Sequence, residues 1–152
     1  MDILPPLLRT APLRMLWTFL ALDLAWSGIV WACSCDLPEP ASVRLDASDA
    51  VFLGTVERNR SLGCQVFVQS SMDQTETRFT VEEGFKAAAE GDTIEIVHGT
   101  SGASCGVVFQ EGESWLVFAR ANEDGRLTTA LCDGNNLEGD AQDDLAALRA
   151  AE

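Results

Sequence analysis

The stretch Trp115–Cys132, WLVFARANEDGRLTTALC, carries the clearest structural signal in the chain. Its first six residues, Trp115–Arg120, form a nearly continuous apolar run, which is typical of a strand that is buried on both faces. Asp124-Gly125 is a strong hairpin signal, because glycine readily adopts the positive φ that tight turns require. We therefore expect a hairpin whose second strand is Leu127–Cys132, and this hairpin indicates a β protein.

Three segments upstream also predict strands. Ala50–Glu57 is rich in β-branched and aromatic residues, and its Gly54 indicates a bulge or a sharp bend. Thr77–Phe85 and Thr93–His98 alternate apolar and polar side chains, as half-buried strands do. The apolar positions of these two segments are Phe79, Val81, Ile94 and Ile96. With the hairpin, the segments give about five short strands, which favours a small β-barrel or sandwich.

Helical signals lie on both sides of the strand region. Residues 41–48 predict a short helical turn, and Ala141–Ala151 predicts a terminal helix with one apolar stripe. That stripe consists of Ala141, Leu145 and Leu148. Asp140 precedes the helix and is the residue type that caps helix N-termini. We expect the helix to seal one side or one end of the sheet.

Residues 1–32 have the features of a secretory signal peptide. Two arginines precede Met15–Val30, an apolar run with Asp23 as its one charged residue, and the small Ala32 directly precedes Cys33. Cleavage after Ala32 leaves residues 33–152, which we expect to form one domain in an extracellular or periplasmic space.

Two other interpretations of this terminus stay open. Bacterial lipoprotein signals also end in a small residue followed by cysteine, and Cys33 would then anchor the protein to a membrane through lipid. Trp31 is bulky for that motif, so lipid anchoring ranks second. An uncleaved membrane anchor ranks third, because a span needs about 20 apolar residues and a central aspartate is costly to insert.

Charge and residue types exclude several functions. The chain has 10 Lys and Arg against 24 Asp and Glu, a net charge of −14. Nucleic acids and anionic membranes attract basic surfaces, so neither is an expected partner. His98 is the single histidine, and at a strand end we expect it to be solvated or hydrogen-bonded. The sequence contains no set of Cys, His and Asp residues in an arrangement that suggests catalysis, so we expect neither enzymatic activity nor a cofactor. We also expect the protein to be a monomer.

Five cysteines follow the cleavage site, and an oxidising compartment favours disulfides between them. They are Cys33, Cys35, Cys64, Cys105 and Cys132. The odd number predicts two disulfides and one thiol left over, but spacing alone does not select the pairing. A redox-active Cys-x-Cys pair ranks low, because redox motifs usually have two intervening residues and open a helix.

The opening Cys33-Ser34-Cys35, with several segments in order behind it, resembles the N-terminal domain of the tissue inhibitors of metalloproteinases and, more broadly, the netrin-like module. The similar segments are Asp49–Val56, Phe85-Lys86, Ser104–Phe109, Trp115–Ala119 and Thr128–Cys132. Ala87 stands where the family has glycine after its aromatic-Lys pair. The cysteine-rich second domain and the third disulfide of the animal inhibitors have no counterpart, and Cys64 matches nothing. The chain is therefore most similar to minimal, bacterial-type members.

The resemblance implies a five-stranded OB-type β-barrel with a C-terminal helix. It also implies two disulfides at the N-terminus, Cys33–Cys105 and Cys35–Cys132. Cys64 is then the leftover free thiol.

In that family the α-amine and carbonyl oxygen of the first cysteine chelate the catalytic zinc of a protease. For this chain the resemblance implies that Cys33 binds the catalytic zinc of the target protease and no metal of its own. It also implies that Ser34 enters the specificity pocket of that protease and that Cys35 tethers the N-terminus. Ala103 and Ser104, ahead of the mid-domain cysteine, flank this contact. The resemblance thus implies a secreted binding module, expected to inhibit a zinc metalloprotease. The alternative is a lipid-anchored or envelope interaction domain without inhibitory activity.

Overall fold

The computed structural model describes residues 33, 35, 39–63, 73–99 and 105–151. The chain divides after Trp31 into two units, and every described residue belongs to the second, Ala32–Glu152. The predicted signal peptide, Ser34, Cys64, Ala103 and Ser104 lie outside the described residues, so the expectations for them stay predictions. Within the described part, none of the helices has the length and apolar character needed to cross a membrane.

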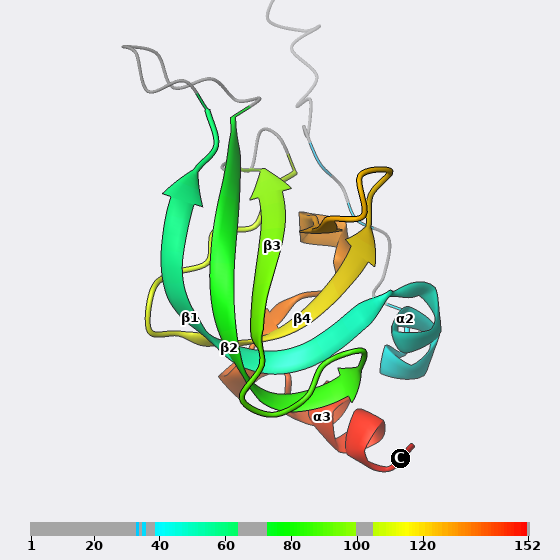
Figure 1. Cartoon of the computed structure of the whole chain (residues 1–152). Helices are drawn as coiled ribbons and strands as arrows, with labels where there is room; N and C mark the ends of the chain where they lie inside the picture. Colours follow the sequence, from blue (N-terminus) through cyan, green and yellow to red (C-terminus); the bar gives the residue numbers. More distant parts are fainter. Residues whose placement is uncertain (1–32, 34, 36–38, 64–72, 100–104, 152) are drawn as a thin grey trace, which may run out of the picture. The chain divides into compact units, whose positions relative to one another are not determined.

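Five strands close into a barrel (Figure 1). They are β1 Ala50–Ser61, β2 Gln74–Lys86, β3 Thr93–Gly99, β4 Ser114–Ala121 and β5 Leu127–Thr129. The spatial order is β1-β2-β3-β5-β4, and an antiparallel β1–β4 pairing closes the ring. β3 and β5 pair in parallel, while the other neighbours are antiparallel. This is the OB-type barrel that the resemblance implied, and the expected fold class is confirmed.

β1 can pair with two strands because it bends. Its first residues, Ala50–Thr55, pair with β4, while its pairing with β2 continues to Ser61. A register shift falls between Leu53 and Gly54, which confirms the bulge expected there. A Cβ at Gly54 would lie 2.9 Å from the carbonyl oxygen of Thr80, so the close approach of β1 to β2 requires glycine.

The barrel interior is filled by side chains from alternate strand positions. Phe52, Phe79, Ile96 and Val117 are fully buried there, and Phe79 meets the rings of Phe52 and Phe109 edge to face. Phe79, Val81 and Ile96 are buried as their alternation predicted, and Ile94 packs against the same cluster partly buried. The alternation of apolar and polar residues therefore predicted correctly which side chains of β2 and β3 face the barrel interior.

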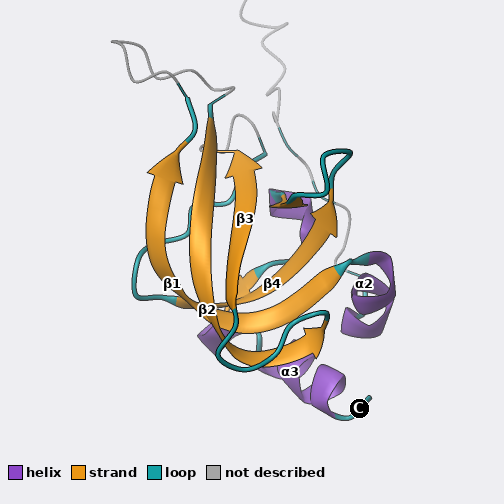
Figure 2. Cartoon of the chain, viewed as in Figure 1, coloured by secondary structure: helices purple, strands orange, loops and turns teal. Residues whose placement is uncertain are grey.

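Helices α2 (Ala41–Ala47) and α3 (Gln142–Arg149) lie outside the barrel (Figure 2). A second apolar cluster joins these helices to the outer face of the strands. It consists of Ala41, Val51, Leu53, Leu116, Phe118, Ala141, Leu145 and Leu148. Because β4 contributes to both clusters, it is buried on both faces, as its continuous apolar run predicted. The apolar stripe of the terminal helix and the short helix near residues 41–48 are confirmed as well.

The expected N-cap at Asp140 is wrong. Asp140 belongs to a 3-10 turn, Glu138–Asp140, and Ala141 is the N-cap without a side-chain cap bond. The Ala141 N–H donates to Leu137 O at 3.0 Å, and its carbonyl accepts from Leu145 N at 2.9 Å. Burial of Ala141 against the barrel thus sets where α3 begins.

The last barrel strand is shorter than expected. β5 ends at Thr129, and Leu131–Asp133 forms a 3-10 turn rather than the end of a strand. The Asp133 carboxylate accepts from Ala130 N at 2.7 Å, which supplies the backbone with a local partner in place of a sheet partner. Beyond the turn, a two-residue strand, β6 (Asn136–Leu137), pairs with the start of β4.

Ala87, where the similar family has glycine, follows β2 with φ of 48° and is exposed. This left-handed conformation destabilises the folded state by about 1–2 kcal/mol for a residue with a Cβ. Glycine avoids that cost, but its more flexible unfolded chain lowers the free energy of unfolding by about 0.4–1 kcal/mol. We expect Ala87→Gly to raise the free energy of unfolding by about 0.5–1 kcal/mol, measured by urea denaturation. Ala89→Gly, in the same loop, is the control and should be neutral or destabilising. Equal destabilisation by both variants would contradict the strain.

Candidate functional site

Two disulfides attach the N-terminal cysteines to the barrel. Cys33 bonds to Cys105 and Cys35 bonds to Cys132, with Cα–Cα distances of 5.8 and 5.3 Å. This is the pairing that the resemblance implied. Cys33 and Cys35 are each bonded to a distant partner and not to one another, which is not the arrangement of a Cys-x-Cys redox pair.

The backbone at Cys105 has an unusual local geometry. Cys105 has φ of 53°, in the left-handed region, and Gly106 follows it. A Cβ at Gly106 would lie 2.1 Å from the carbonyl oxygen of Gly99, so the backbones at these two glycines are in contact. The anchor for Cys33 is thus pressed against the end of β3.

The anchors of the two disulfides are joined to one another. The carbonyl of Cys105 accepts a hydrogen bond from Leu131 N at 2.8 Å, and Leu131 directly precedes Cys132. Both disulfides, this hydrogen bond and the 3-10 turn therefore form one connected unit, which we call the disulfide platform (Cys33, Cys35, Cys105, Leu131, Cys132).

Asn135 fixes the Cys132 side of the platform to the barrel. Its side-chain oxygen accepts from Phe118 N at 2.8 Å, and its side-chain nitrogen donates to Thr129 Oγ1 at 2.8 Å and to Ala130 O at 3.0 Å. One amide thus connects β4, β5 and the turn that carries Cys132.

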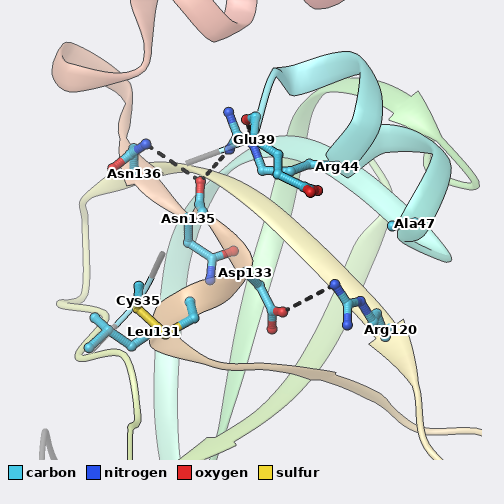
Figure 3. A pocket seen from close by; sticks show the side chains of 11 residues that line it. Cys35, Glu39, Arg44, Ala47, Arg120, Leu131, Asp133, Asn135 and Asn136 are labelled. Atoms are coloured by element: carbon cyan, nitrogen blue, oxygen red, sulfur yellow. Dashed lines mark hydrogen bonds and ion pairs between the residues drawn. A yellow bond between two sulfur atoms is a disulfide. The ribbon is translucent and has the colours of Figure 1, made fainter. Parts of the chain in front are cut away.

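A hollow of about 490 Å³ adjoins the Cys35–Cys132 disulfide (Figure 3). Arg44 of α2 donates to the carbonyl of Gly134 at 2.8 Å, forms an ion pair with Asp144 at 2.6 Å, and lies 4.4 Å over the Phe118 ring. Across the hollow, Arg120 pairs with Asp133 at 3.6 Å. These pairings serve to hold the 3-10 turn and both helices in place.

A second hollow, which shares Leu131 with the first, has two exposed apolar side chains. Val108 is 61% exposed and Leu131 is 45% exposed, and both line a shallow hollow of about 380 Å³ with Trp115. Sequence reasoning missed this patch, which we call the apolar rim (Val108, Trp115, Leu131). The signal at Val108 was its place next to Val107, because neighbouring residues of extended chain point to opposite sides.

Three titratable groups on the strands have shifted pKa values, and none of them belongs to the disulfide platform itself. Hydrogen bonds from Arg149 and Arg78 lower the pKa of Glu83 and Glu95, respectively, and both pairs are on the barrel surface. Burial lowers the pKa of His98 in β3. Within the described ranges, no three His, Cys, Asp or Glu side chains are grouped so that they could hold a metal ion.

Of the residues predicted for the site, the structure describes Cys33 and Cys35, and it brings them together with Cys105 and Cys132. Ser34, Ala103 and Ser104 are predicted neighbours outside the described residues. No protein-family model matches the chain, and no curated protein matches it.

Proposed function

We propose that the chain is a secreted, netrin-like binding module that attaches to a zinc metalloprotease through Cys33 and inhibits it. The observation that carries the proposal is the pair of disulfides that tethers both Cys33 and Cys35 to the barrel. A terminus held at two of its first three residues is a preorganised ligand, because little further ordering is needed on binding.

The chemistry required of Cys33 is within reach of an N-terminal residue. An α-amine has a pKa of about 7.7–8.0, so at neutral pH its proton is lost at small cost when the nitrogen binds a metal. The amine nitrogen and the carbonyl oxygen of one residue can occupy neighbouring positions on zinc. They thereby displace the water that the protease activates for hydrolysis.

The surroundings of the platform favour protein contact. The exposed Val108 and Leu131 side chains line one hollow, and Leu131 directly precedes Cys132, so they supply apolar area next to the disulfide platform. Apolar side chains of this kind gain free energy when a partner covers them, roughly 25 cal/mol per Å². The proposal therefore includes the apolar rim as a secondary contact.

Titration of the chain beginning at Cys33 against a panel of zinc metalloproteases tests the proposal. We expect at least one protease to be inhibited below micromolar concentration, and a small zinc-chelating inhibitor to compete with the chain for that protease. Absence of inhibition of every protease at micromolar concentration would refute the inhibitory function.

A matched pair of variants tests the secondary contact. Val108→Ser removes exposed apolar area beside the platform, and Val43→Ser removes it on α2, where the side chain is 44% exposed. We expect the first to weaken inhibition several-fold and the second to leave it unchanged. Equal effects of both variants would exclude the apolar rim from the contact.

A further inference from the structure

His98, the chain's single histidine, continues the inward series of Ile94 and Ile96 along β3. It is 5% exposed, and its ring meets the Phe109 ring edge to face at 4.9 Å. A buried imidazole needs hydrogen-bond partners for both nitrogens, and those partners determine which nitrogen carries a proton.

The ring nitrogens of His98 connect two groups of different kinds. Nδ1 lies 2.9 Å from the carbonyl oxygen of Gly99, and Nε2 lies 2.6 Å from the hydroxyl of Thr77 on β2. The same hydroxyl lies 2.5 Å from the Oδ1 atom of Asn59 on β1. The Nδ2 atom of Asn59 donates to Phe109 O at 2.9 Å, which fixes the orientation of that amide.

Counting protons shows that a neutral ring cannot satisfy all of these contacts. Gly99 O and Asn59 Oδ1 only accept, and the hydroxyl of Thr77 has one hydrogen to donate. If Thr77 donates to Asn59, Nε2 must donate to Thr77, while Nδ1 must donate to Gly99. The complete network therefore requires a proton on both ring nitrogens.

We infer that His98 is a proton-operated switch: a second ring proton reverses its hydrogen bond with Thr77 and joins Asn59 to the network. In the neutral ring Nδ1 keeps its proton, because the adjacent Gly99 carbonyl can only accept. Thr77 then turns its hydroxyl toward Nε2, and Asn59 Oδ1 loses Thr77 as a donor. On protonation Nε2 donates, and Thr77 is released to donate to Asn59.

The switch is connected to the anchor of Cys33. The Gly99 oxygen that accepts from Nδ1 is the atom closest to the Cβ position of Gly106, directly after Cys105. A charged ring donates a stronger hydrogen bond to that oxygen than a neutral ring. Protonation therefore acts on the backbone contact that supports the Cys33–Cys105 disulfide. Its consequence for zinc binding rests on the proposed function.

Among the residues that the structure describes, burial and backbone carbonyls act on the ring, and no charged side chain is a cause of its shifted pKa. Its register partners are Thr75 on β2 and Thr129 on β5, and Phe109 covers it from the segment after Cys105. Three carboxylates on neighbouring segments already have partners: Glu76 pairs with Arg60 and Arg126, Glu111 accepts from Asn59 N, and Asp133 accepts from Thr129. The other carboxylates of β1 to β3 also have partners: Glu57 with Thr80, Glu82 with Ser114, Glu83 with Arg149 and Glu95 with Arg78. Burial lowers the pKa of His98, and the carbonyls of Gly99 and Val107 partly oppose this shift.

NMR titration of residues 33–152, without any protease, tests the switch. We expect the ring ¹⁵N shifts at pH 8 to show the Nδ1–H tautomer, and the ring to titrate below its ordinary value near 6.5. The Asn59 side-chain amide and the Gly106 backbone amide should change with the same midpoint. A midpoint at or above 6.5, an Nε2–H tautomer, or an Asn59 amide that does not follow the ring would overturn the inference.

Three variants separate the switch from a structural role. Thr77→Val removes the hydroxyl at nearly constant volume, so the His98 midpoint should fall further and the Asn59 amide should no longer follow it. Thr77→Ser keeps the hydroxyl and should restore both. Thr80→Val, whose hydroxyl bonds Glu57 on the other face of β2, should change neither. An unchanged midpoint in a folded Thr77→Val protein would refute the switch, and inhibition measured separately tests the proposed function.

Discussion

Reduction of the two disulfides is expected to unfold the barrel at room temperature. The bonds close loops of 72 and 97 residues. By the chain-entropy relation, each loop is worth about 4–5 kcal/mol, and their sum is an upper bound because the loops overlap. Domains of this size are stable by about 5–15 kcal/mol in total. Circular dichroism with and without reductant measures the effect.

Paired substitutions measure how much stability each disulfide contributes. Cys33→Ala with Cys105→Ala, and Cys35→Ala with Cys132→Ala, should each lower the melting temperature by roughly 10 °C or more. Cys64→Ala, at the predicted free thiol, should leave it unchanged. A reduced chain that melts within a few degrees of the oxidised one would show that the core alone sustains the fold.

The second large effect concerns one additional residue at the N-terminus. A chain with alanine placed before Cys33 keeps both disulfides, but the nitrogen of Cys33 becomes an amide that no longer offers a lone pair to zinc. We expect inhibition to weaken at least about 100-fold, equivalent to about 2.7 kcal/mol of binding free energy. The melting temperature should not change, because the cysteine side chain is untouched.

An alanine added after Glu152 is the matched control for that extension. It changes chain length equally at the other terminus and should leave the inhibition constant as it was. Full inhibition by the N-terminally extended chain would move the contact away from the amine of Cys33, with the apolar rim as the next surface to examine.

Sequence periodicity predicted the parts of the fold that burial determines. Phe79, Val81 and Ile96 face the interior because alternation and burial agree, and Trp115–Ala119 of β4 is apolar because it separates two cores. The ends of elements were less predictable. Asp133, through its bond to Ala130 N, ends the last strand early, and such a local competition leaves no periodic signal.

The candidate site could be predicted in part. Cys-x-Cys indicated disulfides, but their pairing came from the resemblance, since spacing permitted other pairings. His98 was expected as a solvated or hydrogen-bonded side chain, and its two-step alternation from Ile96 was the signal for burial. Its contact with Thr77 depends on the register between β2 and β3, which no single segment encodes. The exposure of Val108 and Leu131 likewise depends on how the barrel closes.

We propose that export exposes the α-amine of Cys33, and the intact mass and N-terminal sequence of the exported protein test this proposal. We expect Cys33 as the first residue and the mass of residues 33–152, less the hydrogens lost in two disulfides. A different first residue would contradict zinc chelation by Cys33. A Cys33 that carries lipid would contradict it equally and would support the envelope-anchored alternative.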